Sequence, residues 1–348
     1  MTSVNLRSDN VAGVASEVMD AIIAANHGSS PSYGSDTLTD GLNAKFGAVF
    51  GCACFVQPVF TGTATNALSL SLLAPGWGAI LCSETAHIHD SECGAVELQT
   101  GGAKLVPLRQ SDGLIKAEVL EEALTQTRWG NTSVAPPKVL SVAQATELGT
   151  VYQPGQLAGL ADLAHRFGLK FHMDGARFAN AVAHLGCPPA EIACDVGIDV
   201  LSFGGTKNGC LCAEAVVCFD EALSEEVRYR ARKMGQVASK MRFVSAQLHA
   251  LLEDNRWLKF AGHANAMATR LSTGLSQLQN VELLHRVDAN EVFVSMPEAM
   301  RSALTSEGFG FYDRGGGHVR MVTAFNTRAE DIDAFIASAA RAQERGDQ

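Results

Sequence analysis

A lysine set between glycines is the first feature of this sequence that could do chemistry. Residues 200–203 form an apolar stretch, Gly204 and Gly205 follow, and then come Lys207 and Gly209. Glycines beside a lysine let a ligand approach the backbone closely and keep the amine out of bulk water. Removal from water lowers the pKa of an amine, which a lysine needs to form a Schiff base near neutral pH. The alternative is a surface lysine in a turn, because short glycine–lysine motifs are common.

Asp174 is a second candidate, one strand–helix unit before the lysine. It falls at the end of a predicted strand, and Arg177 begins the next helix. A carboxylate here could pair with a protonated pyridine nitrogen and preserve the capacity of that ring to accept electrons. Its alternative role is to cap the helix that follows. Asp174 and Lys207, at successive strand ends, would face one cleft.

Gly62 and Thr63 mark a third candidate, where a helix predicted over residues 64–73 begins. Backbone N–H groups and hydroxyls at the N-terminus of a helix can hold a phosphate without any net positive charge. The alternative is ordinary capping of the helix by threonine.

His87 and His89 form the fourth candidate group. Their spacing could suit metal ligands, but the sequence nearby offers no third ligand. A ring stacked on a flat cofactor, or a proton-transfer group, fits the other three candidates better. We therefore expect no metal site here.

These candidates need a sheet to position them, and the first two thirds of the chain predict one. Short apolar runs alternate with helical patterns such as residues 156–167. Such alternation predicts a mostly parallel sheet with helices on both faces, whose ligands bind beyond the carboxyl ends of the strands. The expected strands are 79–82, 104–108, 139–142, 170–173, 200–203 and 215–219.

The last third of the chain predicts a small C-terminal α+β domain. A long helical pattern covers residues 222–280, and a strand is expected at 291–296. Pro297 opens a helix that Gly308 closes. Strands over 309–312 and 319–325 and a final helix over 329–342 complete the pattern. We expect an N-terminal segment at 1–35 that contributes to the active site, a large domain at 36–255 and the small domain at 256–348.

Charge and composition limit the partners. The formal net charge of -10 argues against a nucleic acid or an anionic membrane, which require clustered lysine and arginine. The first residues lack the features of a signal peptide, and no apolar stretch is long enough to span a bilayer. The nine cysteines include the pairs Cys52/Cys54 and Cys210/Cys212, which we interpret as buried thiols and not as zinc ligands. We expect a reduced, cytoplasmic protein.

Together, these residues resemble the threonine aldolase family. The family has the aspartate-aminotransferase-like fold, or fold type I, of enzymes that use pyridoxal 5'-phosphate: a mostly parallel central sheet with helices on both faces. The matching segments run in order over nearly the whole chain: Leu6-Arg7-Ser8-Asp9-Asn10, Tyr33-Gly34-Ser35-Asp36, Thr61-Gly62-Thr63 with Asn66, His87 with Glu92 and Gly94, Asp174-Gly175-Ala176-Arg177, the Lys207 segment, and Val319-Arg320-Met321-Val322-Thr323.

The resemblance implies a role for each matched position. Lys207 would form the Schiff base with pyridoxal 5'-phosphate, Asp174 would hold its pyridine nitrogen, and His87 would stack on its ring. Its phosphate would lie on Gly62 and Thr63. Charge-assisted contacts to the amino-acid substrate, chiefly its carboxylate, would come from Arg320, Arg177 and Ser8.

The resemblance also implies a homo-oligomer, a dimer of dimers, because a neighbouring subunit completes each site in the family. Tyr33 would reach the partner's substrate, and Lys233 and Arg242 its cofactor. These two belong to a basic run that also contains Arg232 and Lys240.

The chain departs from the family pattern in two places. Gln144-Ala145-Thr146-Glu147 stands where many members have Glu-Asn-Thr-His, and the lysine segment has Gly-Gly-Thr-Lys-Asn-Gly in place of Leu-Ser-Lys-Gly. Both departures look like the low-specificity bacterial branch that includes phenylserine aldolases. They leave the catalytic base open among His87, His89 and an ordered water, with His87 preferred.

The implied reaction is cleavage of L-threonine, L-allo-threonine or a related β-hydroxy-α-amino acid to glycine and an aldehyde. The sequence does not choose among these substrates. The alternatives on the same scaffold are a β-eliminating lyase, a transaminase or a racemase. A cofactor-free binding protein would also keep the fold, but the intact Lys207, Asp174, His87 and Arg320 argue against it.

Overall fold

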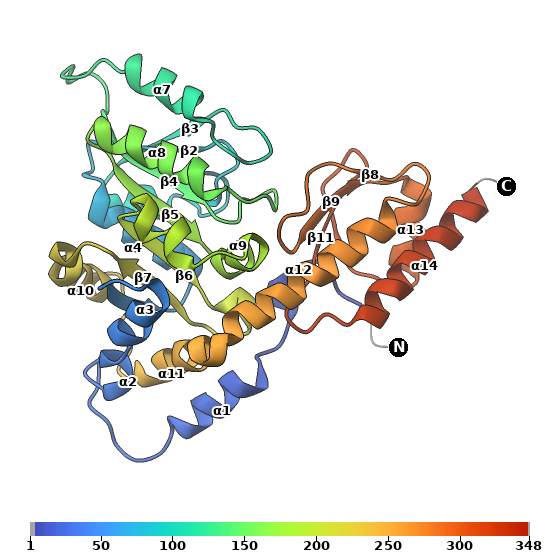
Figure 1. Cartoon of the computed structure of the whole chain (residues 1–348), viewed down its shortest axis with the longest axis horizontal. Helices are drawn as coiled ribbons and strands as arrows, with labels where there is room; N and C mark the ends of the chain where they lie inside the picture. The colour runs from blue at the N-terminus through green and yellow to red at the C-terminus, as the bar shows by residue number, and fades with distance from the viewer. Residues whose placement is uncertain (1–3, 347–348) are drawn as a thin grey trace.

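A large mixed sheet and a small antiparallel sheet form the two parts of this molecule (Figure 1). The computed structural model describes residues 4–346. Residues 1–3, where the signal-peptide and N-terminal-segment predictions begin, and residues 347–348, where the predicted small domain ends, lie outside the described residues. No helix between residues 4 and 346 is both long and apolar enough to cross a membrane.

The large sheet has seven strands in the order β1-β7-β6-β5-β4-β2-β3. The four pairings among β2 to β6 are parallel, whereas β7 is antiparallel to both of its neighbours. A mostly parallel sheet is therefore confirmed. The strands are β1 (Phe55–Val59), β2 (Ala79–Ser83), β3 (Lys104–Leu108), β4 (Pro137–Ala143), β5 (Lys170–Gly175), β6 (Val200–Gly204) and β7 (Glu214–Cys218).

β1 is the strand of the large sheet that the sequence did not predict. It contains Pro58, and a proline argues against a central strand because it cannot donate a ladder hydrogen bond. The structure places β1 at one edge of the sheet and β3, which contains Pro107, at the other. An edge strand tolerates proline because one side of its backbone is unpaired.

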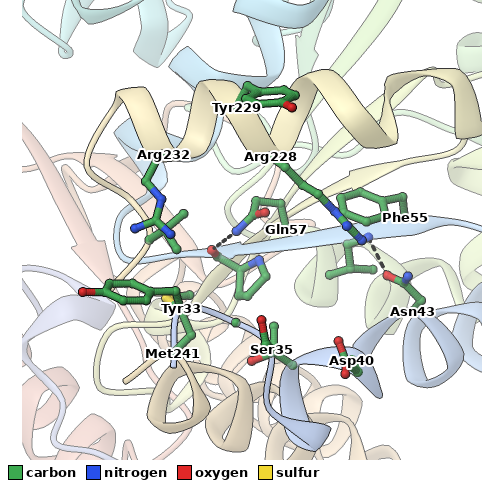
Figure 2. Close-up of a pocket in the computed structure, with 15 residues that line it drawn as sticks. Tyr33, Ser35, Asp40, Asn43, Phe55, Gln57, Arg228, Tyr229, Arg232 and Met241 are labelled. Atoms are coloured by element: carbon green, nitrogen blue, oxygen red, sulfur yellow. Dashed lines mark hydrogen bonds between the residues drawn. The ribbon is translucent and has the colours of Figure 1, made fainter. Parts of the chain in front are cut away.

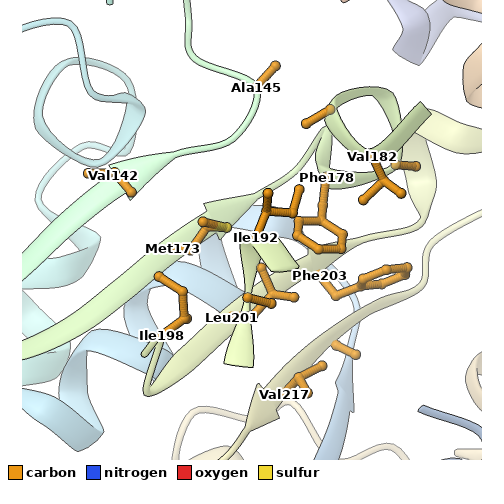
Figure 3. Packing of buried hydrophobic residues seen from close by; sticks show 14 of the residues in the cluster. Val142, Ala145, Met173, Phe178, Val182, Ile192, Ile198, Leu201, Phe203 and Val217 are labelled. Atoms are coloured by element: carbon orange, nitrogen blue, oxygen red, sulfur yellow. The ribbon is translucent and has the colours of Figure 1, made fainter. Parts of the chain in front are cut away.

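Helices cover both faces of this sheet, as predicted. Buried side chains alternate along β7: Val217 belongs to the core on one face, and Val216 to the core on the other. Figure 3 shows the first of these cores, with Met173, Leu201 and Phe203 beneath Phe178 of α9. The helices of this part are α2 (Thr37–Asp40), α3 (Leu42–Phe50), α4 (Gly62–Leu73), α5 (His87–Asp90), α6 (Ala95–Thr100), α7 (Ala117–Thr125), α8 (Pro154–Arg166), α9 (Phe178–Leu185), α10 (Ser224–Lys233) and α11 (Arg242–Leu252).

The small part is an antiparallel sheet in the order β10-β11-β9-β8, covered by helices. Two strand predictions here were wrong in extent: the chain at 309–311 is not a strand, and β11 ends at Val322. The N–H of Thr323 still bonds the carbonyl oxygen of Asn290, while its hydroxyl donates to the carbonyl oxygen of Ala264. The short β8 was not predicted. The elements are β8 (Glu282–Leu283), β9 (Glu291–Ser295), α13 (Glu298–Ser306), β10 (Tyr312–Asp313), β11 (His318–Val322) and α14 (Ala329–Gly346).

Two segments join the parts. The helix α12 (Arg256–Leu275) runs from the large part into the small one and packs against both α9 and α14 (Figure 1). The N-terminal chain crosses in the other direction: Leu6 is buried in the small core and exchanges backbone bonds with Gly310 and Val322, before α1 (Ser16–Ala24) packs on α11. This crossing carries Ser8 and Asp9 past the carboxyl ends of the parallel strands. The domain boundaries at 36 and 256 stay a prediction.

Candidate active site

Lys207 lies on a short 3-10 turn (Thr206–Asn208) directly after β6. A Cβ atom on Gly204 would lie 2.4 Å from the carbonyl oxygen of Ala176, and one on Gly205 would lie 2.4 Å from that of Ala213. These glycines therefore admit the chain's own backbone and not a ligand, contrary to the expectation. The close approach brings the lysine turn against the turn that follows β5.

A buried carboxylate, that of Glu214, binds the backbone of the turn that carries Lys207. Glu214 of β7 accepts the backbone N–H of Gly205 at 2.8 Å, and burial raises the pKa of Glu214 to about 6. Lys207 itself is partly buried and is the one lysine among the described residues that line the site cavities. Lys207 therefore lines a cavity and is not a fully exposed surface lysine.

Asp174 lies near the carboxyl end of β5 with only 8% of its surface exposed. Its Oδ1 accepts the N–H of Ala176 at 3.0 Å, so it orders the turn before α9, as its alternative role required. Its Oδ2 accepts from Nδ2 of Asn66 at 2.7 Å. The carboxylate of Asp174 thus orders the turn through Oδ1 and accepts a hydrogen bond from another residue of the site through Oδ2.

A hydrogen-bonded chain runs from Asp174 to His87. Nδ2 of Asn66 also donates to Oε1 of Glu92 at 2.9 Å, and Nδ1 of His87 lies 2.8 Å from the same oxygen. The bond to Glu92 raises the pKa of His87, whereas burial raises the pKa of Glu92. This series of hydrogen bonds links the orientation of the His87 ring to the position of Asp174.

The N-terminus of α4 offers the amides expected for a phosphate. Thr61 caps the helix, because its Oγ1 accepts the N–H of Ala64 at 3.1 Å. The N–H groups of Gly62 and Thr63 have no partner among residues 4–346, and nothing lies within 4 Å of the place where a Cβ on Gly62 would stand. Capping by Thr61 therefore leaves the N–H groups of Gly62 and Thr63 available for an anion.

Arg177 is held tightly by acidic side chains. Asp9 accepts from its Nε at 2.8 Å and from one of its terminal nitrogens at 3.1 Å. The other terminal nitrogen lies 3.2 Å from Oε2 of Glu291, which is the first residue of β9. The pairing with Arg177 helps to lower the pKa of Asp9. The donors of Arg177 are therefore largely engaged before any ligand arrives.

Arg320 of β11 is held more loosely. Its NH1 lies 3.8 Å from Oε1 of Glu291, and its NH2 donates to the carbonyl oxygen of Arg7 at 3.3 Å. Its Nε is buried without a hydrogen-bond partner within the described chain. Arg320 thus keeps capacity for a carboxylate, which binds guanidinium in a bidentate way.

Two cavities meet at these residues. The inner one is lined by Gly62, Thr63, Asp174 and Lys207, and the outer one by Ser8 and Arg320. Their linings share four residues: His87, Glu147, Arg177 and Lys207. Gly62, Thr63 and Asp174, which are predicted to bind the cofactor, thus lie on the inner side of one junction. Ser8 and Arg320, which are predicted to bind the substrate, lie on its outer side.

The groups that line the inner cavity suit the chemistry of a flat aromatic ring that carries a phosphate and an aldehyde. It presents unpartnered helix amides, a carboxylate, an amine and the face of an imidazole. Oδ1 of Asn66 and Oε2 of Glu92 are also buried there without hydrogen-bond partners among residues 4–346. Buried polar atoms normally have partners, so these two mark a place where a ligand or water belongs.

Several predicted site residues lie elsewhere in the single chain. His89 lines neither of these two cavities. Tyr33 lies beneath Arg232, whose guanidinium carbon is 4.5 Å from the ring centroid, in a separate pocket beside α10 (Figure 2). Lys233 lines another pocket on α10, and Arg242 begins α11. Tyr33, Lys233 and Arg242 are the residues expected to act on a partner subunit.

Glu147, Asp9 and Glu291 are among the site residues that the sequence did not single out. Glu147 was noted only as a departure from a pattern, and Asp9 only as part of a motif. Glu291 had a signal that went unused: it begins an apolar strand, and only 1% of it is exposed. A charged residue that opens a buried strand requires a buried partner.

Comparison with known proteins gives one consistent picture. Residues 5–299 match the family model described as beta-eliminating lyase. The chain is 42% identical to a low-specificity L-threonine aldolase of Pseudomonas sp. over 332 residues, which cover 95% of each chain. It is 39% identical to the low-specificity L-threonine aldolase of Pseudomonas aeruginosa over 327 residues, 93% of this chain and 94% of the relative.

Solved structures agree. Threonine aldolase of Leishmania major superposes with a TM-score of 0.91 at 25% identity, over 97% of this chain and 99% of that one. An aspartate aminotransferase of Thermus thermophilus superposes with a TM-score of 0.71 at 17% identity, over 97% and 96%. The second likeness shows the fold alone, and it confirms the aspartate-aminotransferase-like architecture.

Proposed function

Because this chain belongs to the beta-eliminating lyase family and, within it, to the threonine aldolases, we propose that it cleaves L-threonine, L-allo-threonine and related β-hydroxy-α-amino acids. The products are glycine and an aldehyde. The observation that carries the proposal is the junction at Lys207, where a cavity suited to a phosphate-bearing ring opens into one that ends at Arg320.

Pyridoxal 5'-phosphate is the proposed cofactor. Lys207 would hold it covalently, Asp174 would face its ring nitrogen, and Gly62 and Thr63 would bind its phosphate. His87, whose ring is oriented by Glu92, would stack on it. When bound, the cofactor supplies a conjugated ring that withdraws the electron pair of the broken bond.

The substrate carboxylate belongs on Arg320. This guanidinium has a buried, unpartnered Nε and only one long ion pair, whereas Asp9 and Glu291 already occupy Arg177. We assign Arg177 the role of holding Asp9 and Glu291 at the outer cavity. Ser8 lines the same cavity and completes the proposed carboxylate site. A carboxylate fixed here sets which substrate bond faces the inner cavity, as alignment of a reacting bond requires.

Product analysis tests the reaction. With L-threonine, the purified enzyme is expected to release glycine and acetaldehyde in equal amounts, measured by coupled reduction of the aldehyde and by amino-acid chromatography. Pyruvate with ammonia would show a β-eliminating lyase, amino transfer to an oxo acid a transaminase, and inversion at Cα a racemase. A colourless protein without activity would favour the binding protein. Separate assays of the β-diastereomers give the preference between threonine and allo-threonine.

We further propose that sites are shared between subunits of a homo-oligomer, a dimer of dimers. Tyr33, with 51% of its surface exposed, stacks with Arg232 away from the Lys207 cavity. Arg242 has a buried Nε without a hydrogen-bond partner in the described part of the chain. An aromatic residue and cations gathered at the surface suit contacts to a partner's cofactor and substrate.

Complementation between inactive variants tests shared sites. Lys207→Ala and Arg242→Ala are each expected to be inactive or nearly so, yet their co-expression should restore activity. A mixed dimer contains one site with both wild-type residues, so random pairing should recover about a quarter of wild-type activity per subunit. Mixing after purification, without subunit exchange, is the control. Failure to recover activity in isolated mixed dimers would place Arg242 and Lys207 in one subunit's site.

We also retain the cytoplasm as the proposed location. The nine cysteines are free thiols in the structure. Such usage is typical of proteins kept in a reducing compartment.

A further inference from the structure

The residues at the junction of the two cavities are the candidates for the group that accepts the β-hydroxyl proton of the substrate. A reacting bond must lie where the cofactor and the substrate meet, and four side chains line both cavities: His87, Glu147, Arg177 and Lys207. Cleavage between Cα and Cβ requires that the β-hydroxyl lose its proton. One of these four, or a water that it holds, is therefore the best placed acceptor.

Three of these four residues, Arg177, Lys207 and His87, have other roles in the site. Arg177 has no acceptor atom and is held by Asp9 and Glu291. Lys207 is the proposed attachment of the cofactor. The Nδ1 of His87 is engaged by Glu92, and this bond orients the ring for stacking.

Glu147 differs from the other three because one of its carboxyl oxygens is buried without a hydrogen-bond partner in the described chain. Its Oε1 accepts the backbone N–H of His87 at 2.8 Å. Its Oε2 is buried and makes no hydrogen bond with any residue from 4 to 346. This leaves a carboxyl oxygen with unused hydrogen-bonding capacity in a residue that lines the junction.

The surroundings of Glu147 tune it for proton exchange near neutral pH. Burial raises the pKa of this carboxyl to about 7, and the charges of Asp174 on β5 and Glu291 on β9 act in the same direction. The N–H of His87 on α5 acts against them. Cys82 of β2 and Tyr152 are also close enough for their own pKa values to respond to it. A group that is half-ionised at working pH can both take up and return a proton.

The loop that carries Glu147 is built to hold it there. Gln144 and Tyr152 exchange two hydrogen bonds of 3.0 Å, between the amide side chain of one and the backbone of the other. The hydroxyls of Thr146 and Thr150 are 2.7 Å apart. A rigid loop that buries an incompletely bonded carboxyl costs stability, and such a cost is commonly kept where function needs it.

We propose that Glu147 accepts the β-hydroxyl proton of the substrate, an inference that rests on the proposed aldol cleavage. The O–H bond of the substrate breaks and an O–H bond forms on the carboxylate of Glu147. The Cα–Cβ bond breaks as the C–O bond becomes the carbonyl of the aldehyde, and its electron pair stays on the Cα side, where the proposed cofactor held by Lys207 would supply an electron sink. A water molecule then gives a proton to Cα to form glycine, and the hydroxide that it leaves takes the proton from Glu147, which restores the carboxylate.

Glu147→Gln tests this role with almost no change in shape. Threonine cleavage by the variant is expected to fall about 10²- to 10³-fold in kcat, because an amide cannot take the proton. Exchange of the Cα hydrogen of glycine in deuterium oxide, followed by proton NMR, needs the cofactor site but no β-hydroxyl. It is expected to stay within about threefold of wild type on the same reasoning. Glu147→Asp, which keeps a carboxylate, should recover part of the cleavage.

The outcomes separate the two proposals. Undiminished cleavage by Glu147→Gln would overturn the role of Glu147, and so would equal loss of cleavage and of glycine exchange, which would make the residue a support of the cofactor site. If the wild type exchanged the glycine hydrogen but released no aldehyde from any β-hydroxy amino acid, the aldolase function itself would fail, and the role of Glu147 with it.

The pH dependence provides a second readout. Wild-type kcat is expected to rise through about pH 7, and this limb should be lost in Glu147→Gln. In the cofactor-free protein, the carboxyl binds its proton more tightly when folded than when unfolded. The wild type should therefore lose stability relative to the glutamine variant as pH rises from 4.5 to about 7. A melting-temperature difference that does not grow over this range would contradict the buried acid that the role requires.

Discussion

Lys207→Ala is expected to remove the visible absorption of the purified protein and to lower threonine cleavage on the order of 10⁴-fold or more. Lys207 is the one lysine among the described residues that line the two cavities, so no other amine there can take its place. The measurement is an absorption spectrum of the protein after incubation with pyridoxal 5'-phosphate and removal of the unbound cofactor, together with the rate of acetaldehyde release.

Lys104→Ala is the matched control, because Lys104 is exposed on the edge strand β3 and lies far from the site lining. It should keep both the absorption and the rate. If Lys207→Ala kept normal absorbance, with the cofactor still fixed to the protein by borohydride, the attachment would have to be assigned to another residue.

Asp174→Asn is expected to lower kcat about 10²- to 10³-fold while the cofactor stays attached to Lys207. The substitution keeps the shape but removes the charge that would hold a proton on the ring nitrogen, so the ring would withdraw electrons less well. The KM for threonine should change little, since Asp174 lies on the inner cavity and the carboxylate site on the outer one. Steady-state kinetics and the absorption spectrum measure both.

Asp162→Asn, on the exposed side of α8, is the control for loss of one carboxylate. A near wild-type rate in Asp174→Asn would limit Asp174 to ordering the turn through the N–H of Ala176. Loss of folding is a separate outcome, which circular dichroism of the variant detects.

Much of the architecture could be predicted from local pattern. Strands β2 to β7 and the helix α8 lie where periodicity placed them, within a few residues. The wrong strand predictions have physical causes. Pro58 argued against a strand at β1, which lies at the edge of the sheet, and residues 309–311 have the apolar composition of a strand but do not pair as one. Local pattern reports which residues suit a pleated or helical surface, but not which strand lies at an edge.

The candidate site was predictable in part, for a similar reason. Gly62, Thr63, His87, Asp174 and Lys207 each follow a strand or open a helix, and the topology rule for parallel sheets brings such positions together. Asn66 was quoted in a motif, but its bridge between Asp174 and Glu92 depends on distances across α4 and β5. These two hydrogen bonds join residues that lie 26 and 108 positions apart in the sequence. Contacts at such separations leave no periodic signal in the sequence.

The segment around Lys207 shows which properties follow from the sequence and which depend on the tertiary structure. By itself, the sequence determined the type of fold, the order of the elements and the residue types available for a Schiff base, an electron sink and a phosphate cradle. Only the tertiary structure decided that Gly204 and Gly205 admit the backbone and not a ligand, that Arg177 is closely paired while Arg320 keeps an unpartnered Nε, and that Glu147 lies at the junction with a free carboxyl oxygen. Residue type sets what a side chain can do, whereas burial and the neighbours brought in from distant strands set its charge, its partners and its remaining bonding capacity.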